Sequence, residues 1–181
     1  MGGAGLLIGY IVVLVGYQNV QQSHLSDSWG HDHPLVADAV LASTGTHHAH
    51  LADGQAVAKL SLPTVGYDGI VAEGADRGIL TGGPGHDDRT AYPGEGGVVL
   101  ISNHNGFSMS WNNLQAGDAA VVEMPYGRYR YRITSRTIVP GDDTGVLDKK
   151  RSGETLLLTT CWPLWQGNLA GERLVFEARP A

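Results

Sequence analysis

Three side chains in this sequence could together perform nucleophilic chemistry on a carbonyl group: a thiol, an imidazole and a guanidinium. Cys161 is the single cysteine among the 181 residues, so its thiol cannot form a disulfide within the chain. A nucleophilic thiolate needs a proton acceptor or a cation beside it and a third group that stabilises the oxyanion. His104 and Arg173 could supply these two groups. Taken alone, however, a lone cysteine is more often a buried and inert side chain.

Each of the three residues stands at the end of a segment with the composition of a β-strand. Residues 96–102, GGVVLIS, form a continuous apolar run before His104, which predicts a strand buried on both faces. Residues 154–161 are strand-like and end in the thiol, while residues 173–179 alternate and open with the guanidinium. We therefore expect strands to position the reactive groups.

The other segments after residue 55 are also short and strand-like. The segment 56–62 alternates, and the pair 119–124 and 128–139, separated by a turn, predicts a hairpin. In the segment 128–139, apolar and aromatic residues are expected to face one side and arginines the other. The first set is Tyr129, Tyr131 and Ile133, and the second is Arg128, Arg130 and Arg132. Short strands, frequent turns and few helical signals predict an all-β fold, either a barrel or a sandwich.

The overall charge argues against a nucleic-acid partner. The net charge is -6 and the pI is about 5.7, whereas phosphate contacts need clustered positive charge. Alternating arginine and tyrosine in 128–139 could bind nucleic acid. In an acidic chain, a half-buried strand explains this pattern better.

The N-terminal part divides into an apolar and a polar segment. Ala4–Tyr17 carries no charge, but it is shorter than the about 20 residues that span a bilayer as a helix. A buried core helix is one alternative. We interpret residues 1–17 as a hydrophobic membrane anchor, shortened at its cytoplasmic end. The segment 18–54 is polar and rich in histidine, which predicts a stalk.

Two parts of the chain raise the question of a metal. The stalk contains most of the histidines, and neutral imidazoles close in sequence can bind zinc or copper: His24, His31, His33, His47, His48 and His50. No cysteine or regular second ligand set completes a closed site there. A second set of residues could bind calcium, but its spacing matches no calcium-binding motif: Asp87, Asp88 and Glu95. We therefore assign no cofactor and no metal ligand.

The order of the motifs resembles that of the sortase family. In that family a strand ends in a histidine, a later strand ends in Thr-Leu-x-Thr-Cys, and an arginine opens the strand after it. Here residues 157–161 read LLTTC, with Leu157 in place of the first threonine. The segments 83–104, 112–122 and 172–178 are similar to the family's histidine loop and strand, the following turn and the arginine strand.

The resemblance implies a fold and a set of roles. It implies a closed sortase-type β-barrel with short helices for residues 55–181, which would be the catalytic domain. Cys161 would be the nucleophile, His104 the general acid and base, and Arg173 the group that holds substrate and oxyanion. It also implies substrate contacts from residues within or next to the motifs: Asn103, Leu158, Thr160 and Trp162. The first of these stands where the family usually has glycine.

By resemblance, the protein is expected to be a membrane-anchored cysteine transpeptidase outside a Gram-positive cell. Its thiol would cleave an LPXTG- or LAXTG-like sorting motif of an exported protein between threonine and glycine. An amine of a cell-wall precursor, or of another protein, would then accept the acyl group. The short chain and the N-terminal anchor favour a class D or E type.

Two alternatives remain from the sequence alone. A cysteine peptidase on the same barrel would release the acyl group to water. A non-catalytic extracellular module would instead bind metal through the histidine-rich stalk. The loop that begins with Trp162, Pro163 and Trp165 could line a substrate groove or cap the end of the barrel.

Overall fold

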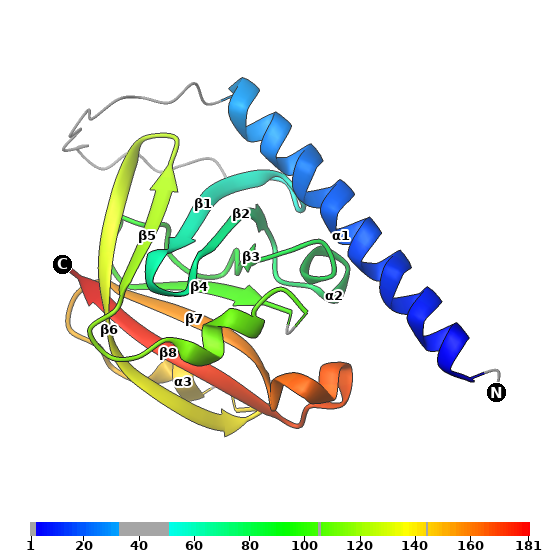
Figure 1. The fold of residues 1–181 in the computed structure, drawn as a ribbon. Coiled ribbons are helices and arrows are strands. Elements are labelled where there is room, and N and C mark those ends of the chain that lie inside the picture. The colour runs from blue at the N-terminus through cyan, green and yellow to red at the C-terminus, as the bar shows by residue number, and fades with distance from the viewer. Residues whose placement is uncertain (1–2, 33–50, 105, 144) are drawn as a thin grey trace.

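The computed structural model describes residues 3–32, 51–104, 106–143 and 145–181. Eight strands close into a barrel in the order β1-β2-β3-β4-β7-β8-β6-β5 (Figure 1). All neighbouring pairs are antiparallel except β2–β3 and β4–β7. The closed all-β barrel predicted from the sequence is confirmed. The strands are β1 (Ala56–Leu62), β2 (Tyr67–Glu73), β3 (Gly85–His86), β4 (Val98–Asn103), β5 (Ala119–Met124), β6 (Gly127–Pro140), β7 (Thr155–Trp162) and β8 (Glu172–Pro180).

Six of these strands correspond to predicted segments, with ends that differ by at most a few residues. Strands β2 and β3 were not predicted from the sequence. In β2, Asp68 and Gly69 interrupt the apolar pattern, and β3 has only two residues, which is too short for any period to be read.

The barrel interior is filled by alternate side chains of the strands. Leu174, Phe176 and Ala178 of β8 face the core, as their spacing predicts, together with Val99 and Ile101 of β4. The largest fully buried side chains include Trp111, Tyr131 and Leu158. Burying such side chains is the main favourable term that holds the barrel together.

A second, smaller apolar cluster lies on the outside of the barrel. Leu100, Leu157 and Val175 point away from the interior, and the short helix α3 (Gly145–Asp148) packs Val146 and Leu147 against them. This explains why the segment around β4 is apolar on both faces. The other short helices are α2 (Arg77–Leu80) and the 3-10 helices η1 (Pro63–Val65), η2 (Met109–Asn113) and η3 (Leu164–Leu169).

A β-bulge in β6 reverses the direction in which its side chains point. The pairing with β8 runs from Ile133 opposite Ala178 to Ser135 opposite Glu177, so one extra residue is accommodated. Before this bulge odd-numbered residues of β6 face the core, and after it they face outward. The alternation predicted for the first half of β6 therefore does not continue to its end.

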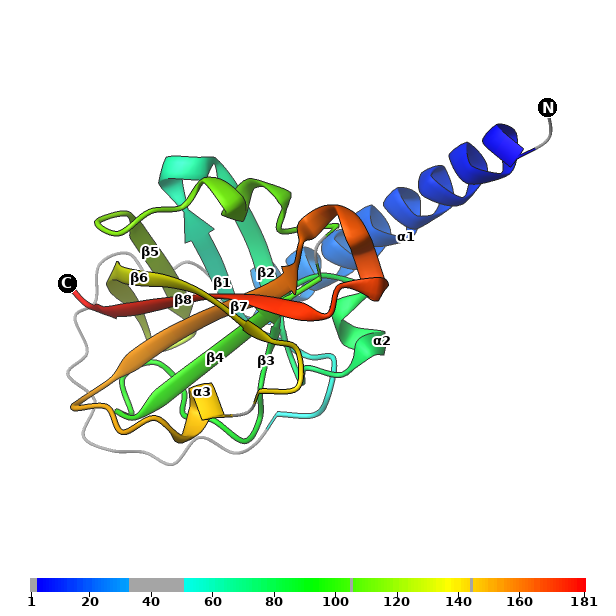
Figure 2. The ribbon, with the colours of Figure 1, turned by 90° about the horizontal axis from the view of Figure 1, so that it is seen from below.

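A long helix precedes the barrel. Helix α1 (Gly3–Asp32) contacts β1 and β2 through its C-terminal half, where Trp29 is buried (Figures 1 and 2). Its N-terminal half extends beyond the barrel. The predicted boundary between anchor and stalk at residue 17 falls inside this helix, and much of the predicted stalk lies outside the described residues. Among the described helices, none is long and apolar enough to cross a membrane.

We expect Leu158→Ala to destabilise the fold strongly, because the side chain is fully buried in the barrel core. A leucine-to-alanine cavity typically costs about 2–5 kcal/mol in the free energy of unfolding. Urea denaturation measures this difference. Leu169→Ala is the matched control, since Leu169 is 88% exposed. Equal unfolding midpoints for the two variants would contradict the assignment of Leu158 to the core.

Candidate active site

The pairing of three adjacent strands brings the three predicted reactive residues together. In the antiparallel pair β7–β8, Cys161 lies directly opposite Arg173. In the parallel pair β4–β7, Asn103 lies opposite Thr160, so His104 follows β4 at the level of Cys161. Residues directly opposite one another on neighbouring strands have Cβ atoms about 4.5–5.5 Å apart.

By strand parity, the side chains of Cys161 and Arg173 belong to the outer face of the barrel. Two and four residues before Cys161, Thr159 and Leu157 have the same strand parity, and Leu157 packs in the outer cluster. Arg173 shares its parity with Val175 of that cluster. The thiol is free and partly exposed, so a substrate can reach it.

Arg173 lies close to the point where the segment after β6 meets the segment before β8. Its Nη1 donates a hydrogen bond to the carbonyl oxygen of Glu172 at 3.1 Å. The backbone N–H of Gly141 donates to the carbonyl oxygen of Gly171 at 2.8 Å, which ties the β6–β7 segment to the β7–β8 segment beside it. A Cβ atom at residue 141 would lie 3.3 Å from Nη1 of Arg173. The nearer neighbour of that Cβ position is the carbonyl oxygen of Gly171 at 2.8 Å, so glycine here allows the two segments to approach each other.

The loop that carries His104 is held from inside the barrel. The carbonyl oxygen of His104 accepts hydrogen bonds from the hydroxyl of Ser108 at 3.1 Å and from the N–H of Phe107 at 2.9 Å. The Ser108 hydroxyl also bonds to the hydroxyl of Thr160 at 2.5 Å. Thr160, next to the thiol in sequence, is thus connected to the histidine loop by two side-chain bonds.

The predicted substrate contacts of Asn103, Leu158 and Thr160 do not agree with their positions. All three alternate with the outward residues and point into the barrel, where their exposed fractions are 2%, 0% and 2%. Asn103 donates from Nδ2 to the hydroxyl of Tyr67 at 3.0 Å. The strand period explains this difference: residues an odd number of positions apart along a strand face opposite sides of the sheet.

Trp162 also has a packing role. Its ring contacts the barrel core cluster, and the guanidinium carbon of Arg136 lies 5.2 Å from the ring centroid. Leu164 is buried, whereas Trp165 is 78% exposed. Of the two predicted roles for this loop, capping of the barrel applies to Trp162 and Leu164, and Trp165 is free to contact another molecule.

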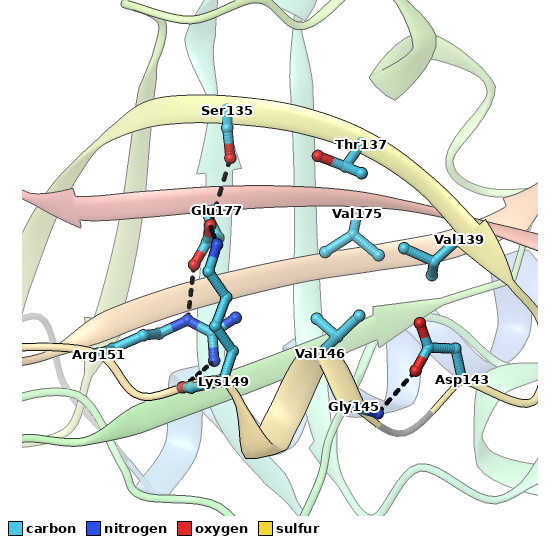
Figure 3. Close-up of a pocket in the computed structure, with 10 residues that line it drawn as sticks. All are labelled: Ser135, Thr137, Val139, Asp143, Gly145, Val146, Lys149, Arg151, Val175 and Glu177. Atoms are coloured by element: carbon cyan, nitrogen blue, oxygen red, sulfur yellow. Dashed lines mark hydrogen bonds and ion pairs between the residues drawn. The ribbon is translucent and has the colours of Figure 1, made fainter.

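A pocket of about 380 Å³ opens on the outer face (Figure 3), and one of its lining residues, Val139, lies opposite Arg173 in the β6–β8 pair. The floor of the pocket includes Thr137 and Val139 of β6, which face outward because of the β-bulge. Helix α3 and the segments beside it form the opposite wall. In Figure 3 the three valines and Asp143 lie toward one end, and Glu177, Lys149 and Arg151 gather at the other. The lining residues are Ser135, Thr137, Val139, Asp143, Gly145, Val146, Lys149, Arg151, Val175 and Glu177.

The charged end of the pocket is organised around Glu177. Its carboxylate accepts hydrogen bonds from Nε of Arg151 at 2.6 Å and from Nζ of Lys149 at 3.1 Å. Burial by itself would raise the pKa of Glu177, but these hydrogen bonds and charges outweigh it and hold the pKa below its usual value. The ion pairs fasten the chain after α3 to β8.

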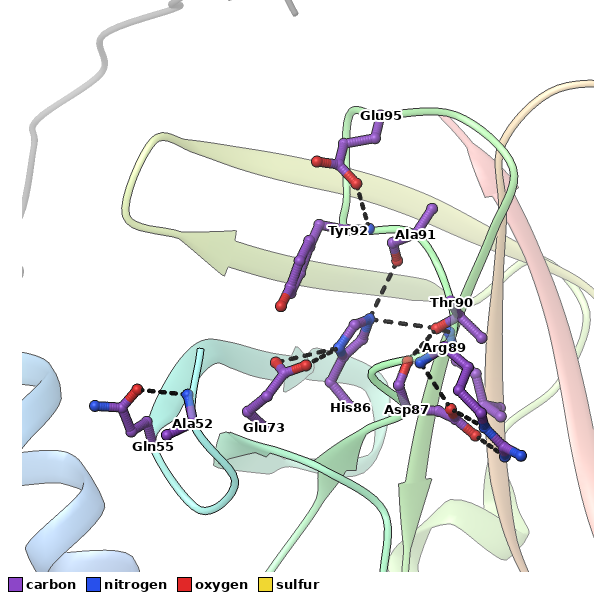
Figure 4. A network of polar contacts seen from close by, with 11 residues as sticks. Ala52, Gln55, Glu73, His86, Asp87, Arg89, Thr90, Ala91, Tyr92 and Glu95 are labelled. Atoms are coloured by element: carbon purple, nitrogen blue, oxygen red, sulfur yellow. Dashed lines mark hydrogen bonds and ion pairs between the residues drawn. The ribbon is translucent and has the colours of Figure 1, made fainter. Parts of the chain in front are cut away.

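A buried polar network that sequence analysis did not detect lies around His86 (Figure 4). Nδ1 lies 3.2 Å from a carboxylate oxygen of Glu73, and Nε2 lies 3.1 Å from the carbonyl oxygen of Ala91. The ring stacks on Tyr92, with centroids 4.6 Å apart. Both ring nitrogens therefore have polar partners inside the barrel wall. This network fixes the loop between β3 and β4, and the loop's sequence shows no pattern that would have revealed it.

The acidic loop considered as a calcium site contains an ion pair. Asp87 accepts two hydrogen bonds from the guanidinium of Arg89, which lower the pKa of the Asp87 carboxyl. Within the described ranges, no group of three or more histidine, cysteine or acidic side chains is arranged to hold a metal ion. Four histidines of the predicted stalk lie outside those ranges: His33, His47, His48 and His50.

Comparisons with known proteins agree with this fold. Residues 60–181 match the family described as the sortase domain. Sortase D of Bacillus subtilis (strain 168) is 31% identical over 128 residues, which cover 70% of this chain and 65% of that protein. The chain therefore spans just under two thirds of that relative's length.

Two solved structures share the fold. One is a Clostridium perfringens Sortase D5 transpeptidase, with a TM-score of 0.66 and 24% identity over 72% of this chain and 82% of that one. The other is a Clostridium perfringens sortase C solved with the C-terminal cell wall sorting motif. It has a TM-score of 0.65 and 19% identity, and the match covers 93% of this chain and 87% of that one.

We expect Glu177 to make the stability of the fold depend on pH. Because its folded-state pKa is lowered, its contribution is complete above the usual glutamate pKa of about 4.3 and is lost as the pH falls through the lowered value. Thermal unfolding between about pH 7 and pH 3 should show a smaller loss of Tm in Glu177→Gln than in the unchanged protein. Parallel Tm curves would contradict this expectation.

Proposed function

The chain belongs to the sortase family, and from this premise we propose that it is a cysteine transpeptidase whose catalytic residues are Cys161, His104 and Arg173. The observation that carries the proposal is the register of β4, β7 and β8, which brings these residues to one level across three neighbouring strands. The alignment supplies a nucleophile, an acid and base, and a fixed set of hydrogen-bond donors at one place.

The proposed reaction has two halves. The thiolate of Cys161 attacks the carbonyl carbon of a Thr–Gly peptide bond, and the guanidinium of Arg173 donates hydrogen bonds to the oxyanion that forms. The imidazolium of His104 gives its proton to the departing amine as the C–N bond breaks, which leaves a thioester. A second amine then attacks the thioester, passes a proton to His104 and releases the thiolate.

We further propose that the substrate is an exported protein with a C-terminal sorting motif. The outer pocket supports this, because Val139, Val146 and Val175 offer an apolar surface to the aliphatic residue that begins such a motif. The sortase C with a similar fold was solved with a sorting motif. The acceptor amine would come from a cell-wall precursor or another protein, and the identity to a Sortase D favours class D.

The proposed site of action is the extracellular face of the cell membrane. The support for membrane attachment is the uncharged N-terminal segment of α1, in which Val12 and Val13 are 64% and 69% exposed. Attachment would bring the barrel close to exported proteins and to membrane-bound acceptors.

The roles of the three residues can be tested with a sorting-motif peptide, LPXTG or LAXTG in type, and triglycine as the amine. We expect Cys161→Ala to abolish the thioacyl enzyme in mass spectra. His104→Ala should lower turnover by about 10²- to 10⁴-fold and Arg173→Ala by about 10²- to 10³-fold. His24→Ala and Arg179→Ala are controls of the same residue types outside the site.

The same assay distinguishes transfer from hydrolysis. A transpeptidase forms the triglycine adduct, whereas a cysteine peptidase releases only the free acid. Near-normal turnover in His104→Ala or Arg173→Ala would remove that residue from the mechanism. Activity that survives in Cys161→Ala would refute the proposed nucleophile.

Membrane attachment is tested by flotation with phosphatidylcholine vesicles, which avoid repulsion of this acidic chain. We expect the unchanged protein to float and the double variant Val12→Lys/Val13→Lys to remain in solution, because charged side chains are costly to bury in lipid. Asn19→Lys, outside the apolar segment, is the control. An unchanged protein that does not float would contradict the proposed attachment.

A further inference from the structure

The barrel has a gap beside the histidine loop, and helix α1 fills it. Strand β3 pairs with β2 only at Ala72 and Glu73, so β2 has no strand partner on that side at Ile70. Ile70 has the same parity as Ala72, whose N–H donates to the carbonyl oxygen of Pro84 at 2.9 Å. The N–H and carbonyl groups of Ile70 therefore point into this gap.

The side-chain amide of Gln22 takes the place of the missing strand. Its Oε1 accepts a hydrogen bond from the N–H of Ile70 at 3.0 Å. Its Nε2 donates to the carbonyl oxygens of Ile70 and of Gly82, each at 3.2 Å. One amide thus pairs with β2 as a backbone would and also fastens the chain that leads into β3.

Glycine residues allow this close approach. A Cβ atom at Gly83 would overlap Nε2 of Gln22, and one at Gly82 would lie 3.3 Å from Cβ of Gln21. The contact between helix and barrel is therefore closely fitted at this point, and Trp29 anchors the same helix further along.

One helical turn before Gln22, the same face of α1 reaches the loop that carries His104. A Cβ atom at Gly106 would lie 3.4 Å from Nε2 of Gln18 and 3.7 Å from Nδ1 of His104. The N–H of Gly106 points to Nδ1 of His104 at 3.4 Å. The amide of Gln18 and the imidazole therefore border the same glycine.

We propose that Gln18 and Gln22 are positioning residues: Gln22 docks α1 in the gap left by the short strand β3, and Gln18 then supports the loop that aims His104 at Cys161. This inference rests on the proposed function, because it assumes that the imidazole serves the thiol. It makes the docked helix a part of the active site, although α1 carries none of the proposed catalytic residues.

Two measurements on the full chain test the proposal. The first is the rate of alkylation of Cys161 by iodoacetamide as a function of pH, which requires no substrate. The second is kcat and KM for transfer of a sorting-motif peptide to triglycine. The variants are Gln18→Ala and Gln22→Met, and Ser23→Ala is the matched control, because its hydroxyl bonds only within the helix, to the carbonyl oxygen of Val20.

We expect both glutamine variants to lower kcat by about 10- to 100-fold with little change in KM, since a small misplacement of a catalytic group costs this much. The alkylation profile should move to higher pH, because a thiolate that loses its cationic partner forms less readily. The double variant should be no worse than the more impaired single variant, since both residues act through one loop.

The proposal is overturned if the glutamine variants match Ser23→Ala in kcat and in the alkylation profile. It is also overturned if they lower only Tm, which would leave α1 a purely stabilising element. Failure of the unchanged protein to transfer any peptide would refute the proposed function instead, and the alkylation profiles would still decide whether the two glutamines position His104.

Discussion

The side-by-side pairing of β4, β7 and β8 is the constraint on which the rest of the molecule depends. A parallel pair and an antiparallel pair share the central strand, and their registers place His104, Cys161 and Arg173 on one level. A shift of one residue in either register would turn one of these side chains to the other face of the sheet. Packing holds β7 on both faces, because Leu158 is buried in the core and Leu157 in the outer cluster.

Elements around the three strands hold the segments that carry His104 and Arg173. Ser108 and Thr160 hold the histidine loop from the barrel interior, and α1 borders it from the outside. On the other side, the contact between Gly141 and Gly171 joins two segments next to Arg173. Short polar contacts thus surround a site whose strands are fixed by apolar packing, so positioning and stability come from different interactions.

The outer pocket depends on a local irregularity. A single extra residue in β6 turns Thr137 and Val139 from the core side to the outer face, where they meet Val175 of β8. The charge cluster around Glu177 then fastens the chain that closes the pocket over this surface. A bulge of this kind leaves one residue of the ladder unpaired and turns an apolar surface outward beside the strand that carries Arg173.

The sequence by itself determined the strands with strong patterns and the class of the barrel, and it predicted three candidate catalytic residues, because each of these is encoded by local period or by a motif. It also suggested substrate contacts for Leu158, Thr160 and Asn103, and here the side-chain period of a strand decided otherwise. The bulge in β6, the two-residue strand β3 and the amide of Gln22 that fills the gap beside it came only from the tertiary structure. They depend on which strands become neighbours, and contacts between residues far apart in the chain leave no mark on local spacing.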